Sequence, residues 1–69
     1  MSIAKVIEVL AEGDSIEAAI QSAVTEAAET VRGIRHVYVE GLQALVEHDE
    51  VVKYRVNAKL TFVVEAGRE

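Results

Sequence analysis

The regular alternation of apolar and polar side chains near the C-terminus restricts the possible folds of this chain more than any other feature of its sequence. From Lys53 to Phe62 apolar and polar residues alternate strictly. The apolar set is Tyr54, Val56, Ala58, Leu60, Phe62 and, beyond them, Val64; the polar set is Lys53, Arg55, Asn57, Lys59 and Thr61. A period of two is typical of a strand with one buried and one polar face. We therefore predict a strand over residues 51–65.

Two more segments favour strands. The segment IAKVIEVLAEG, residues 3–13, is rich in valine and isoleucine and stops at Gly13, which predicts a strand over about residues 4–11. Another strand is predicted over about residues 35–47, and the polar stretch EHDE, residues 47–50, forms the turn that follows it.

A helix is predicted between the first two strands, because apolar residues recur there at helical spacing. They are Ile16, Ile20, Ala23, Val24, Ala27 and Val31. Asp14 can cap the helix, with Glu17 reaching back to it, and Ser15 is the alternative cap. Gly33 suits the left-handed position after the last turn, and Arg32 would lie near the C-terminal dipole.

The turn between the last two strands sets their register. We expect Val46 opposite Val51, and a bulge near Gly41 would shift the lower part of the pairing. The helix-covered face is then predicted to hold Val37, Val39, Leu45, Tyr54, Val56 and Leu60. The opposite face is predicted to hold Ile34, His36, Tyr38, Glu40, Arg55, Asn57, Lys59 and Thr61.

The size and charge of the chain limit its function. A domain of 69 residues has a small core, and without cysteine it has neither disulfides nor thiolate zinc sites, so we expect oligomerisation to stabilise it. The net charge of −5 argues against nucleic acid and anionic membranes as partners. Since residues 1–10 lack the apolar core of a signal peptide, we expect a cytoplasmic protein.

No arrangement of residues typical of an enzyme is present, and we expect no catalytic activity. The run His48-Asp49-Glu50 is either a weak cation site or simply a polar turn. Arg55 and its neighbouring lysines can hold an anionic ligand, or they pair with acids such as Glu40 on the next strand. The rings of His36 and Tyr38 can stack on an aromatic ligand or fill a contact between subunits.

The whole chain resembles the dodecins. The likeness runs from residue 4 to residue 65 and rests on AKVIEV, SIEAAIQSAVTEAAETVRGIR and YRVNAKLTFVVE. It implies an α+β fold of order β-α-β-β over a single domain, residues 1–69, with a three-stranded antiparallel sheet wrapped on one helix. It also implies a hollow homododecamer that stores a flavin (FMN, FAD or riboflavin), stacked in pairs between tryptophans near twofold axes.

The resemblance also implies a ligand site at His36, Tyr38 and Arg55. Counted from Gly33, His36 takes the place of the stacking tryptophan, and Arg55 takes that of a glutamine that bonds to the flavin ring. Tyr38 lies where some dodecin-like sequences have a tryptophan. These departures predict weakened or lost flavin binding. The alternative is a structural or ion-binding dodecamer, for example with calcium, in which these residues join subunits.

Overall fold

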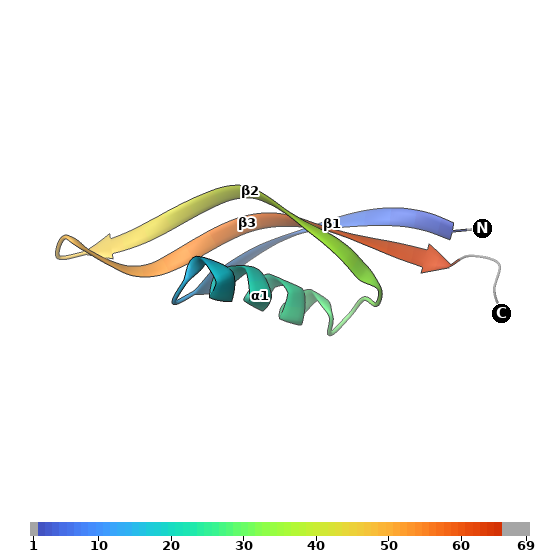
Figure 1. Cartoon of the computed structure of the whole chain (residues 1–69), viewed down its shortest axis with the longest axis horizontal. Coiled ribbons are helices and arrows are strands. Elements are labelled where there is room, and N and C mark those ends of the chain that lie inside the picture. The colour runs from blue at the N-terminus through green and yellow to red at the C-terminus, as the bar shows by residue number, and fades with distance from the viewer. Residues whose placement is uncertain (1, 66–69) are drawn as a thin grey trace.

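The computed structural model describes residues 2–65, in which one helix packs against one face of a three-stranded sheet (Figure 1). The elements are β1 (Ser2–Gly13), α1 (Ile16–Ala27), β2 (Ile34–Glu47) and β3 (Glu50–Glu65). Both pairings are antiparallel, and the strand order is β1-β3-β2. The predicted fold class is confirmed, and the alternating strand β3 occupies the centre of the sheet.

The apolar face of β3 forms the core together with the small residues of α1. Val56, Ala58 and Leu60 are fully buried, and Phe62 is nearly so. The helix contributes three buried alanines, Ala19, Ala23 and Ala27. Because alanine has the shortest apolar side chain, α1 lies close to β1 and β3, on which it mainly packs. The predicted burial of the helix-facing residues of β3 is confirmed.

The close approach of α1 to β1 depends on a glycine. A Cβ atom added at Gly13 would lie 2.5 Å from the backbone nitrogen of Ala19, well inside the contact distance. The first turn of the helix is capped by Ser15, whose Oγ accepts a hydrogen bond from the Ala18 N–H at 3.0 Å. Of the two predicted caps, the alternative one is therefore correct.

The helix is shorter than the sequence pattern predicted. It ends at Ala27, with Ala28 as its C-cap, so Arg32 and Gly33 lie beyond the last turn. Gly33 does adopt a positive φ of 74°, but it does so in the connection that leads into β2. Val31 still packs on the core from this connection, which explains why its spacing looked helical.

The β1–β3 register runs without a break, whereas the β2–β3 register shifts three times. The predicted pair Val46–Val51 is confirmed, and so is a bulge near Gly41, where Glu40 is the extra residue. A second bulge at Arg35 places Ile34 opposite Phe62 on the helix side, so its predicted position beside His36 was wrong. A third shift was missed as well.

The third shift lies near the turn, where Val52 is the extra residue of β3. It pairs Leu45 with Lys53, so Leu45 lies on the face away from the helix, contrary to the prediction. The turn itself consists of His48 and Asp49, both with positive φ (52° and 64°), as a type I′ hairpin turn requires.

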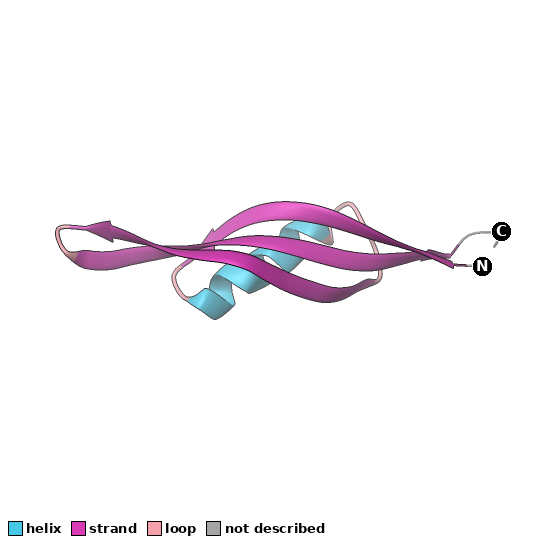
Figure 2. Cartoon of the chain, turned by 90° about the horizontal axis from the view of Figure 1, so that it is seen from above, coloured by secondary structure: helices cyan, strands magenta, loops and turns pink. Residues whose placement is uncertain are grey.

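Beyond the end of β1 the β2–β3 hairpin continues as a two-stranded arm, residues 45–53, which neither β1 nor the helix accompanies (Figures 1 and 2). The molecule is therefore elongated, with extents of 55 × 19 × 13 Å. Within residues 2–65, no helix is both long and apolar enough to cross a lipid bilayer.

Candidate functional site

The face of the sheet opposite α1, called the outer face here, consists of cross-strand rows set by the register. From the end of the sheet where β1 and β2 begin, toward the β2–β3 hairpin turn, the rows are Val6–Thr61–His36, Glu8–Lys59–Tyr38, Leu10–Asn57–Gly41 and Glu12–Arg55–Gln43. The end where β1 and β2 begin is called the free end of the sheet here. His36, Tyr38 and Arg55 all lie on this face, together with the polar residues of β3, as the alternation predicted.

The outer face does not bring these three residues together within one chain. His36 and Tyr38 occupy neighbouring rows, and both are exposed, Tyr38 at 65%. Arg55 lies six positions along β3 from Thr61, the partner of His36. At ~3.3 Å per residue that separation is about 20 Å. A ligand as small as a single ring system could therefore contact both His36 and Arg55 only where two chains supply them.

The bulged residue Glu40 forms an ion pair with the central strand. Its Oε2 lies 3.1 Å from Nζ of Lys59. This hydrogen bond and the charge of Glu40 raise the pKa of the Lys59 ammonium above its ordinary value. Of the two roles considered for the cations of β3, cross-strand pairing with an acid is thus the one found at Lys59.

Arg55 is also paired, and its partner is a residue that sequence reasoning missed. Nε and Nη2 of Arg55 donate hydrogen bonds to the same oxygen of Glu12, Oε2, at 3.0 and 2.7 Å. Glu12 lies directly opposite Arg55 because β1 is adjacent to β3. Since the sequence did not reveal that strand order, nothing marked Glu12 as the partner.

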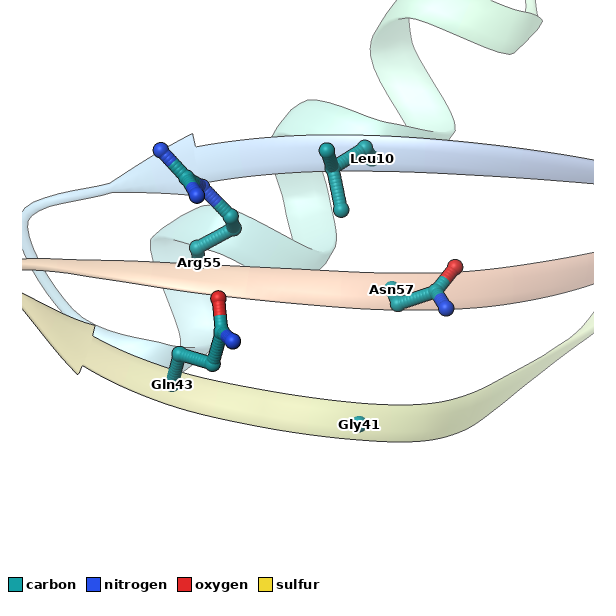
Figure 3. A pocket seen from close by; sticks show the side chains of 5 residues that line it. All are labelled: Leu10, Gly41, Gln43, Arg55 and Asn57. Carbon is teal, nitrogen blue, oxygen red and sulfur yellow. The ribbon is translucent and has the colours of Figure 1, made fainter.

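A hollow of about 340 Å³ opens between these rows, lined by Leu10, Gly41, Gln43, Arg55 and Asn57 (Figure 3). Gly41 lines the hollow on the side of β2 and has no side chain to fill the space. A Cβ added there would lie 3.9 Å from Cβ of Asn57, an ordinary contact. Of the lining residues only Arg55 was predicted as a site residue, and the bulge near Gly41 was the one available signal for the others.

The hairpin turn gives no sign of a metal centre in the described chain. Across residues 2–65, no three His, Asp or Glu side chains approach closely enough to hold a metal ion. His48 and Asp49 shape the turn by their backbone conformation, and Glu50 begins β3.

Comparison with known proteins places the chain in one family. The family model for dodecin matches residues 3–65. The structure is similar to Streptomyces coelicolor dodecin, with 28% identity, 96% of each chain covered and a TM-score of 0.86. It is also similar to a Thermus thermophilus dodecin mutant, with 26% identity, coverage of 94% of this chain and 98% of that one, and a TM-score of 0.86. No curated protein matches significantly. From the family match and these structures, the chain is a member of the dodecin family.

Proposed function

We propose that this dodecin assembles as a homododecamer that binds or stores a flat, flavin-type ligand, held weakly, and that it is not an enzyme. The observation that carries the proposal is the outer face, where the exposed rings of His36 and Tyr38 occupy neighbouring rows and the row after Tyr38 begins an open hollow lined by Arg55 and two amide side chains. Flat rings and amide groups are what a heteroaromatic ligand requires for stacking and hydrogen bonding.

Exposed apolar side chains support the assembly. Leu10 is 66% exposed, and Val6 and Val46 are each 58% exposed, although all are large and apolar. Large apolar side chains exposed on a chain this small favour burial against other subunits. The separation of His36 from Arg55 supports the same conclusion, because a second copy can supply the residue that one chain holds too far away.

The aromatic residue at the stacking position supports weak binding. Stacking of a base on an aromatic side chain is worth about 1–3 kcal/mol, so an imidazole at His36 in place of an indole should reduce affinity about ten- to hundredfold. We expect His36 to lie near a symmetry axis of the assembly, with Tyr38 and Arg55 of the same or the neighbouring subunit around the ligand.

Native mass spectrometry and an absorption spectrum test the assembly and the ligand separately. We expect one species of twelve chains that resists dilution, and a colourless or faintly yellow preparation. A folded, stable monomer at micromolar concentration would contradict the assembly.

Quenching of flavin fluorescence tests the site. His36→Trp with Arg55→Gln should tighten flavin binding about ten- to hundredfold. Arg35→Trp is the matched control, since this single substitution adds one indole and removes one positive charge at the position next to His36. Nanomolar affinity in the unmodified protein would refute weakened binding. No gain in the double variant would favour a structural dodecamer in which these residues only join subunits.

A further inference from the structure

We propose that Glu12 determines the specificity of the outer-face hollow: by neutralising Arg55 it makes the site favour uncharged ligands over phosphorylated ones. The inference rests on the proposed function and names its ligand class, a neutral flat heterocycle with amide-type edges. Riboflavin and FMN, which share a ring system and differ in one phosphate, are the probes that separate the two classes.

The geometry of the ion pair carries this inference. Two nitrogens of Arg55 donate hydrogen bonds to one oxygen of Glu12, at 3.0 and 2.7 Å. Arg55 lines the hollow and its side chain is 35% exposed, so a ligand there would cover a guanidinium that water now reaches, beside the carboxylate of Glu12. Covering the paired arginine increases the attraction between the two opposite charges, because water no longer screens them.

The other groups around the hollow carry no net charge. Gln43 and Asn57 offer amide donors and acceptors, and Leu10 adds an apolar surface (Figure 3). The nearest cation toward the free end of the sheet, Lys59, is paired with Glu40. Lys53 lies one row closer to the turn and does not line the hollow. The described lining therefore suits hydrogen bonds to a neutral ring better than a contact with an anion.

A phosphate at the guanidinium of Arg55 would meet an unfavourable neighbour. Glu12 accepts from that guanidinium, so the phosphate would either lie close to its carboxylate or displace it and leave a covered, unpaired charge. Both outcomes weaken binding of the anion but not of the neutral ligand. The carboxylate of Glu12 thus disfavours phosphorylated ligands by repulsion, and specific binding sites often exclude competing ligands in this way.

The test compares dissociation constants for riboflavin and FMN in the wild type, Glu12→Gln and Glu8→Gln. Both substitutions remove one acidic charge from the outer face of β1, but only Glu12 contacts Arg55. We expect the wild type to bind riboflavin at least as tightly as FMN. Glu12→Gln should shift the ratio about tenfold toward FMN, and Glu8→Gln should leave it nearly unchanged. Native mass checks assembly, and Glu12→Ala is a second variant should Glu12→Gln assemble poorly.

Three results would overturn the inference: a wild type that prefers FMN, no change of the ratio in Glu12→Gln, or an equal change in Glu8→Gln. If no variant bound either flavin, the proposed ligand would be wrong, and inorganic phosphate would then decide the role of Glu12. Phosphate, against chloride at equal ionic strength, should raise the melting temperature of Glu12→Gln more than that of Glu8→Gln. Equal increases would overturn the inference independently of the flavin result.

Discussion

The two pairings of β3 differ in regularity. Toward β1 the ladder runs unbroken from Ser2–Glu65 to Gly13–Tyr54, and α1 packs mainly on these two strands. Toward β2 the register shifts at Arg35, Glu40 and Val52. The regular pairing supports the core. The interrupted pairing shapes the site, because the bulge at Glu40 turns Gly41 and Gln43 to the outer face, where they line the hollow.

The largest expected effect comes from removing a core side chain of the central strand. Phe62→Ala should lower the free energy of unfolding by about 3–5 kcal/mol, because it removes a nearly buried aromatic side chain from the apolar face of β3 and leaves a cavity there. Lys59→Ala, three residues away on the outer face, should have a much smaller effect in the same denaturant titration. Equal effects would mean that the two faces of β3 do not differ as described.

A glycine at the end of the regular ladder should tolerate substitution poorly. Gly13→Ala places a Cβ 2.5 Å from the backbone nitrogen of Ala19, so the start of α1 must move away from β1. Overpacking of this kind costs about 1–3 kcal/mol. Thermal unfolding followed by circular dichroism measures it, and an unchanged midpoint would show that α1 does not approach β1 so closely.

The same substitution in the interrupted pairing should behave differently. Gly41→Ala introduces a Cβ at an ordinary 3.9 Å from that of Asn57, and it restricts the unfolded chain, so stability should stay within about 1 kcal/mol of the wild type. The new methyl group would take up space in the lining of the hollow, however, and should weaken riboflavin binding. Loss of stability like that of Gly13→Ala would contradict this contrast.

The smallest effect concerns pH. The folded-state pKa of Lys59 is raised above its ordinary 10.5 by Glu40, so its stabilising contribution is complete below that pH and is lost as the pH rises through the folded-state pKa. Because the Lys59 side chain is 43% exposed and water screens the pair, the change is small. Denaturant titrations of the wild type and Glu40→Gln between pH 9 and 11.5 should converge at the alkaline end, and parallel curves would argue against the pair.

The sequence predicted the elements well because β3 alternates so regularly and the alanine-rich segment has helical spacing. It predicted the positions of Ile34 and Leu45 wrongly because a bulge moves every following side chain to the other face, and bulges depend on packing between strands. The Glu12–Arg55 pair was missed for a related reason: contacts across β1–β3 depend on strand order, a tertiary property. Whether His36, Tyr38 and Arg55 form one site stays a prediction.

The two-stranded arm has a consequence for local dynamics. A hairpin without a third strand or a helix is only marginally stable in water, and here it exposes Val46, Val51 and Val52. Its backbone amides should therefore exchange hydrogen rapidly in a free chain and become protected only when another subunit covers them. Exchange rates in residues 45–53, compared with those in the centre of β3, would then report subunit association residue by residue, before any change in overall secondary structure.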